Sequence, residues 1–186
     1  ICAAFIISII EDILLYHLLV IKKEKNSLMM LKKLHLVCSV IVFFFFNISL
    51  LKADLLIPQN SILPAEVIKI QLVGLMNNDK EFKDSGIEQT WNFAHPNNKK
   101  NTGPLPNFKM MIKGNSYQML LNHISHTITE LGSSDNWAQF EVVILDKEKI
   151  YHKFNWQVEK FTLEGPLQGC WLTTVVSNPI PLGSSI

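Results

Sequence analysis

Arginine is absent from this chain, because all 17 residues counted as lysine or arginine are lysines. The protein therefore has no guanidinium fork of the kind that binds phosphate or carboxylate bidentately, or that reads guanine in the major groove. The lysines are nearly balanced by 16 acidic residues, which gives a net charge of +1. This balance argues against a strongly basic nucleic-acid-binding protein, and we expect no nucleic acid partner.

Motifs with a recognisable catalytic spacing are also missing. The sequence contains no glycine-rich phosphate loop, no nucleophile elbow and no zinc-ligand spacing. Of its three cysteines only Cys170 lies after residue 53, so the later part of the chain cannot form an internal disulfide. Neither neighbour of Cys170 supplies the cation or base that a nucleophilic thiol requires. We expect neither a cofactor nor a metal.

What the chain does have is an excess of apolar residues near its beginning. From Met30 the order is Lys32 and Lys33, an apolar run over residues 34–51, and then Ala53. This order is typical of a signal peptide, so we interpret residues 30–53 as one that is cleaved after Ala53. The alternative is that residues 34–51 remain as a membrane anchor, because about 18 apolar residues are the lower limit for crossing a bilayer. In both cases the two lysines predict that the domain is exported.

Residues 1–29 contain a second apolar stretch, interrupted by the adjacent acids Glu11 and Asp12, which would be costly in lipid. We interpret them as sequence upstream of the start at Met29 or Met30, or as an extra apolar segment. The remainder, residues 54–186, holds 11 lysines and 13 acidic residues. It is long enough to fold alone as a single domain.

The first part of this domain shows helical periodicity. Residues 64–77 place apolar side chains around so much of a helix that we expect it to be buried on more than one side. Ser85 and Glu88 have capping-box spacing and predict a second helix, which His95 and Pro96 end. The polar residues 97–103 predict a solvated loop.

A third helix is expected over residues 104–112, with Gly114 as its left-handed stop, and residues 116–122 could add one more turn. The period then changes from about 3.6 to 2. This alternation predicts strands over residues 124–131, 137–145, 150–161 and 170–176. We therefore expect an α+β domain in which three to four N-terminal helices pack on a curved antiparallel sheet of about four strands.

Several segments, taken in order, resemble the family described as domain of unknown function 4864. They are Pro64–Val67 with Gln71 and Leu72; Phe93–Asn98; Thr102–Pro104 with Phe108 and Met111; Tyr117 with Leu120 and Leu121; Tyr151 with Trp156; and Gly169–Thr173 with Val175. The resemblance implies a fold similar to the cone of nuclear transport factor 2 and ketosteroid isomerase, and it implies no activity. This chain has Asn98–Lys99 where members of the family commonly have Asn–Arg, which weakens any role that needs a guanidinium.

A cone of this kind has a pocket between its sheet and its long helix, which is the default place to look for a ligand. The candidates to line it are aromatic or titratable side chains: Trp91, Tyr117, His152, Trp156 and Trp171. Core packing competes as the interpretation for the aromatic residues. For His152 the competing interpretation is a core histidine that is bonded to a backbone carbonyl.

Two further histidines, His123 and His126, lie three residues apart, but no carboxylate or thiolate at ligand spacing accompanies them. We therefore do not expect a metal there. Apart from His152, the inward strand positions are almost wholly apolar, which argues against an enzyme. The sequence favours a non-catalytic module that binds an apolar small molecule or a protein. The alternatives are a small hydrolase or isomerase that acts from a cone pocket, and a membrane-tethered structural subunit.

Overall fold

The structure, a computed structural model, describes Leu15 and residues 54–184. The elements of the second range are α2 (Pro64–Met76), α3 (Ser85–Asn92), α4 (Pro96–Thr102), α5 (Leu105–Lys113), the 3-10 turn η1 (Gln118–Leu120), β1 (Ser125–Ser133), β2 (Trp137–Leu145), β3 (Ile150–Lys160), β4 (Trp171–Val176) and β5 (Ile180–Ser184). Apart from Leu15, the expected segments 1–29 and 30–53, with the apolar run 34–51, lie outside the described residues. No helix that the structure describes has the length and apolar character needed to span a membrane.

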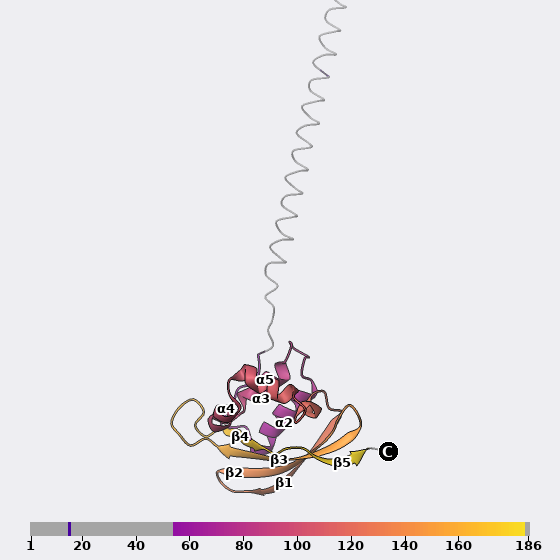
Figure 1. Ribbon diagram of the computed structural model, residues 1–186. Coiled ribbons are helices and arrows are strands. Elements are labelled where there is room, and N and C mark those ends of the chain that lie inside the picture. Colours follow the sequence, from indigo (N-terminus) through magenta and orange to yellow (C-terminus); the bar gives the residue numbers. More distant parts are fainter. Residues whose placement is uncertain (1–14, 16–53, 185–186) are drawn as a thin grey trace, which may run out of the picture. The chain divides into compact units, whose positions relative to one another are not determined.

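The strands form one open sheet, and Figure 1 shows helices α2 to α5 gathered on one side of it. Strands β1 to β4 follow one another as an antiparallel meander, while β5 pairs with the first residues of β3. The coarse prediction of an α+β domain with helices on an antiparallel sheet is confirmed, and all four predicted strands are present. The fifth strand was not predicted.

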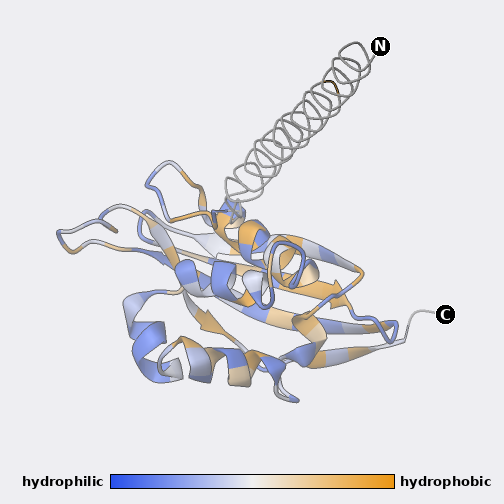
Figure 2. Cartoon of the chain, turned by 90° about the horizontal axis from the view of Figure 1, so that it is seen from above, coloured by the Kyte–Doolittle hydropathy of each residue, from blue (hydrophilic) through white to orange (hydrophobic). Residues whose placement is uncertain are grey.

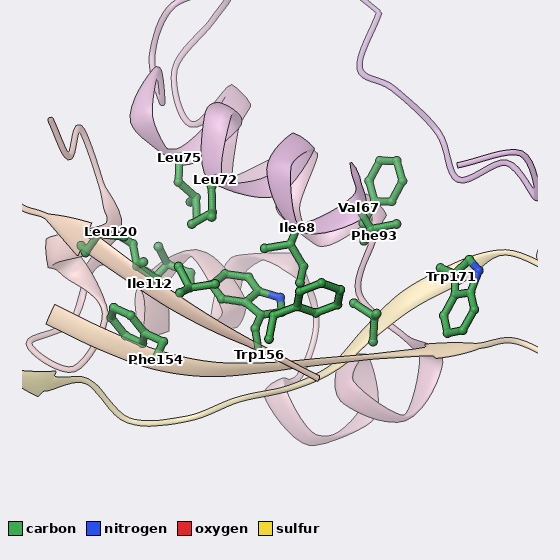
Figure 3. Packing of buried hydrophobic residues seen from close by; sticks show 14 of the residues in the cluster. Val67, Ile68, Leu72, Leu75, Phe93, Ile112, Leu120, Phe154, Trp156 and Trp171 are labelled. Atoms are coloured by element: carbon green, nitrogen blue, oxygen red, sulfur yellow. The ribbon is translucent and has the colours of Figure 1, made fainter. Parts of the chain in front are cut away.

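Buried and exposed residues alternate along the strands, and the buried ones form the core. In Figure 2 hydrophobic and hydrophilic bands alternate along the strands. The inward residues of β2, and Phe154, Trp156 and Val158 of β3, are fully or almost fully buried, and they meet an apolar stripe of α2 (Figure 3). The buried cluster includes Val67, Ile68, Leu72 and Leu75 from α2, Ala138, Phe140, Val142 and Ile144 from β2, and Phe154, Trp156 and Val158 from β3. Burying one large apolar side chain of this kind contributes about 1.5–3 kcal/mol.

Two glycines bring α2 and α3 into close contact. A Cβ on Gly86 would lie 2.0 Å from the carbonyl oxygen of Gly74, so no larger residue fits at position 86. The expectation that α2 is buried on more than one side is confirmed, because the helix packs against α3 as well as against the sheet. It is not buried all round, since Val73 is 40% exposed.

Helix α3 begins at Ser85, as predicted, but the capping role of Ser85 is wrong. The N-cap is Asp84, which has the left-handed conformation. The Ser85 hydroxyl instead donates to the carbonyl oxygen of Asn78 at 2.8 Å and ties the helix to the preceding loop. The helix also ends at Asn92, three residues before His95.

The expected loop over residues 97–103 is wrong, since residues 96–102 form helix α4. The loop was predicted because this segment has no apolar periodicity, and in the structure no residue of α4 is buried. Local contacts hold it instead. Pro96 occupies the first turn, and the His95 ring accepts a hydrogen bond from the backbone N–H of Asn97 at 3.1 Å.

The third helix is confirmed as α5, but its expected stop is wrong, because Gly114 has a φ of −76° and lies in the extended region. The predicted extra turn is present as η1.

Candidate functional site

A cavity of about 90 Å³ lies between the helices and the sheet. Its lining comes from α2, α3, α4, α5, the turn η1 and strands β3 and β4. In Figure 3 Leu75, Ile112 and Trp156 extend into the space between α2 and the sheet. The lining residues are Gln71, Leu75, Thr90, Ala94, Asn98, Thr102, Phe108, Met111, Ile112, Tyr117, Leu120, Trp156, Thr173 and Val176.

One wall of the cavity carries a chain of buried polar groups. The indole N–H of Trp156 donates to the Thr173 hydroxyl at 3.2 Å, and this hydroxyl donates to Gln71 Oε1 at 2.6 Å. Gln71 Nε2 in turn donates to the carbonyl oxygen of Thr90 at 3.0 Å. Each side chain is at most 2% exposed. Because every buried donor has an acceptor, the wall is polar without the penalty of unpaired groups.

Three further polar side chains lie around this wall. The Tyr117 hydroxyl donates to the carbonyl oxygen of Val176 at 3.3 Å, and Asn98 Nδ2 donates to that of Thr173 at 3.3 Å. The Thr102 hydroxyl donates to the carbonyl oxygen of Asn98 at 2.9 Å. Burial raises the pKa of Tyr117, so its phenol stays protonated at neutral pH.

The cavity lining therefore contains no group that exchanges a proton near neutral pH. None of its residues is an acid, a histidine, a lysine or a cysteine. The side chains that most often act as general bases or as activated nucleophiles are therefore not part of this lining, whose polar side chains are amides, hydroxyls and one indole. The arrangement suits binding by shape and by a few hydrogen bonds.

The five candidate residues do not all come together. Tyr117 and Trp156 line the cavity, whereas Trp91, His152 and Trp171 do not. Trp91 packs against Phe108 with ring centroids 5.0 Å apart, and Trp171 is buried with Lys160 Nζ 5.0 Å from its ring centroid.

His152 belongs to a separate polar cluster at the β2–β3 turn. Its Nε2 lies 2.8 Å from Asp146 Oδ2, so its partner is a carboxylate and not the backbone carbonyl that we expected. Asp146 Oδ1 accepts hydrogen bonds from the backbone N–H groups of Glu148 and Ile150, both at 2.9 Å. Burial alone would raise the pKa of Asp146, but the hydrogen bonds from Ile150, His152 and Glu148 together lower it. The Nδ1 atom of His152 is buried and has no hydrogen-bond partner among Leu15 and residues 54–184.

His123 and His126 form a hydrogen-bonded pair. His123 Nε2 lies 2.8 Å from His126 Nδ1, and His123 Nδ1 lies 2.7 Å from the carbonyl oxygen of Leu120. Burial lowers the pKa of both rings, and Lys69 lowers that of His126 further. In the described part of the chain no three His, Cys, Asp or Glu side chains are grouped so that they could hold a metal ion.

Sequence reasoning missed most of the polar residues at the cavity. Gln71 is a polar residue inside the apolar stripe of α2, which is the signal that could have identified it. Thr173 and Asn98 gave no such signal, because their contacts join segments about 75 to 100 residues apart. Asp146 could have been found, since it lies six residues before His152 on the other side of the predicted hairpin turn.

Comparison of the chain with protein-family models, with curated proteins and with solved structures gave no match.

Proposed function

We propose that this protein is an exported, non-catalytic binding module whose ligand is a small, mostly apolar molecule held in the cavity. The observation that carries this proposal is a lining that is largely apolar, has a polar wall already paired within the protein, and contains no titrating group at neutral pH. A ligand with one hydrogen-bonding group fits this wall, because Asn98 and Tyr117 lie beside it.

The volume limits the size of the ligand. Binding pockets for drug-sized molecules measure about 300–1,000 Å³, whereas this cavity measures about 90 Å³. One water molecule occupies about 30 Å³ of liquid, so the cavity holds about three water-sized groups, and a single ring such as benzene enters it with a small movement of one wall. Helix α4 is the wall best able to move, because none of its residues is buried.

The residues that carry the family resemblance also favour this cavity as the binding site. Most of the cavity lining belongs to the segments that resemble domain of unknown function 4864, among them Gln71, Asn98, Phe108, Tyr117 and Thr173. We include in the proposal a cone of the nuclear transport factor 2 type, with this cavity as its pocket. A protein partner at the cavity and a membrane-tethered structural subunit remain the competing proposals.

The alternative of a hydrolase or isomerase that acts from His152 requires its ring to reach a bound substrate. His152 lies outside the cavity lining and is bonded to Asp146, so the cavity offers this alternative no base.

Titration of the full-length chain with benzene and phenol, followed by two-dimensional NMR of the methyl groups, tests the proposal. We expect saturable shifts at the methyl groups of Leu75, Met111 and Leu120, which line the cavity. Met111→Trp fills the cavity and should abolish the shifts at Leu75 and Leu120. The control Met110→Trp changes the neighbouring side chain, which is 66% exposed, and should keep them. Equal binding by both variants would contradict a ligand site in this cavity.

A further inference from the structure

The edges of the sheet are not equally protected. The outer edge of β4 pairs with a neighbouring segment, because His95 N donates to the Thr173 carbonyl oxygen and Thr173 N donates to that of Phe93, both at 2.8 Å. Strand β5 contains Pro181, which has no N–H to offer a further strand. Among the residues that the structure describes, no strand pairs with the outer edge of β1.

The hydrogen-bond pattern shows which residues of β1 face this open edge. In an antiparallel pair the residues alternate between bonding to the partner strand and pointing their N–H and C=O groups to the other side. Asp146, which follows β2, donates to the carbonyl oxygen of Ile150 at 3.0 Å. Even-numbered residues of β2 therefore bond to β3, and odd-numbered residues of β2 bond to β1.

The pairing of β1 with β2 shows which residues of β1 bond to β2. Thr127 and Thr129 are paired with odd-numbered residues of β2, so their N–H and C=O groups bond to β2. The N–H and C=O groups of His126, Ile128 and Glu130 consequently face the open edge. This stretch contains neither the lysine nor the proline by which exposed edges are commonly blunted, and the register shift of β1 comes only after Glu130.

The open stretch is complementary to itself. If a second copy aligns antiparallel with Ile128 opposite Ile128, then His126 of each copy lies opposite Glu130 of the other. These two residues share the helix side of the sheet, because their partners Ile144 and Phe140 in β2 are both buried there. On the other side the same register places Thr127 opposite Thr129, and threonine pairs of this kind stabilise antiparallel strands.

The hydrogen bonds define which ring nitrogen of His126 carries the proton. The Leu120 carbonyl can only accept, so His123 donates from Nδ1 and accepts at Nε2. His126 must then donate from Nδ1, which leaves its Nε2 without a proton while the ring is neutral, and this Nε2 has no hydrogen bond among the described residues. Burial and the nearby Lys69 lower the pKa of His126, so the cation that the Glu130 carboxylate of a second copy approaches here is Lys69 and not the imidazole.

We infer that β1 is an association strand: a second copy of this chain pairs antiparallel along its open edge, with the two Ile128 residues on the twofold axis and His126 facing Glu130 across it. Such a contact is isologous, which means that it closes after two copies. It extends the sheet through backbone hydrogen bonds, as in strand addition.

Cysteine cross-linking of the full-length chain tests the pairing and its register. Cys2 and Cys38 are first changed to serine, while the buried Cys170 is kept. One sample carries Thr127→Cys and an affinity tag, and the other carries Thr129→Cys. Both positions are exposed. Directly opposed residues that lack mutual hydrogen bonds have Cα atoms about 4.5 Å apart, within the range of a disulfide. We expect the mixture to form disulfide-linked dimers several-fold faster than either sample alone.

A charge reversal is the second test of the pairing. Glu130→Lys sets a lysine opposite His126 and near Lys69 of the second copy, and the repulsion between the two lysines should weaken association about tenfold, which slows cross-linking of the mixture. Glu164→Lys makes the same charge change in the exposed β3–β4 loop and should leave the rate unchanged. A mixture that cross-links no faster than its components, or equal effects of the two charge reversals, would overturn the inference.

Discussion

At the scale of single residues, the hydroxyl of Thr173 is the group that links the hydrogen bonds of the cavity wall. It accepts from Trp156 Nε1 and donates to Gln71 Oε1, so it connects two buried groups that have no other hydrogen-bond partner in the described part of the chain. Neither contact could be predicted from the sequence, because a threonine in an apolar strand looks the same whether its hydroxyl is bonded or exposed. The sequence did predict that Trp156 is an inward residue of its strand.

Replacing this hydroxyl should be costly. Thr173→Val keeps the shape but leaves Trp156 Nε1 and Gln71 Oε1 without partners, which should lower the free energy of unfolding by about 2–4 kcal/mol. Thr173→Ser keeps the hydroxyl and should recover most of that loss. Chemical denaturation measures both variants. Thr174→Val, at the half-buried neighbouring position, is the control and should cost under about 1 kcal/mol. Equal losses at positions 173 and 174 would contradict the role of the network.

The Asp146 carboxylate should make stability depend on acid. Its pKa in the folded protein is lowered from 3.8, so its ionised form stabilises the folded state above that value. As pH falls through 3.8 toward the folded pKa, this contribution is lost. The difference in unfolding free energy between the unaltered protein and Asp146→Asn should therefore be constant above about pH 5 and should shrink below pH 4. Asp135→Asn, at an exposed turn position, is the control. A difference that stays constant down to pH 2 would be inconsistent with the lowered pKa.

At the scale of elements, the accuracy of the sequence predictions followed the amount of apolar periodicity. Strands β2 and β3 and helix α2 were predicted close to their ends, because each has a buried face with a regular repeat. Helix α4 was missed because all its residues are polar or proline and none is buried. Strand β5 was missed because it is exposed throughout and contains a proline, both of which weaken the pattern of a strand.

The packing of α2 against α3 depends on Gly86. In Gly86→Ala the new Cβ would lie 2.0 Å from a backbone oxygen of α2, so the two helices must separate. We expect a loss of about 3 kcal/mol or more in the free energy of unfolding, at the upper end of what overpacking costs. Gly132→Ala is the matched control, because its Cβ would meet only a Trp137 ring atom at 3.7 Å. Thermal unfolding by circular dichroism compares the two. A Gly86→Ala variant as stable as the control would show that the helices are not in this close contact.

At the scale of the whole molecule, the α+β class and the position of α2 on the sheet were predictable, because both follow from the order and periodicity of the segments. The cavity itself could not be predicted. Its existence depends on small mismatches in packing between five helical or turn elements and two strands, which no local pattern records. The same limit applies to the open edge of β1, since its complementarity appears only once the register with β2 is known.

The signal peptide expected over residues 30–53 predicts the first residue of the mature chain. We expect the exported protein to begin at Asp54, because Ala53 has the small side chain that a signal peptidase requires before its cut. N-terminal sequencing of the protein from a secreting host measures this directly. A mature chain that still contains residues 34–51 would favour the membrane anchor instead.

The central claim is that a ligand-sized apolar space lies between the helices and the sheet, and diffraction from crystals under xenon pressure tests it most directly. Xenon enters apolar cavities because it needs contact surface and no hydrogen bonds. The account predicts xenon density bounded by Leu75, Phe108 and Trp156. A structure in which these side chains close on one another and exclude xenon would contradict it.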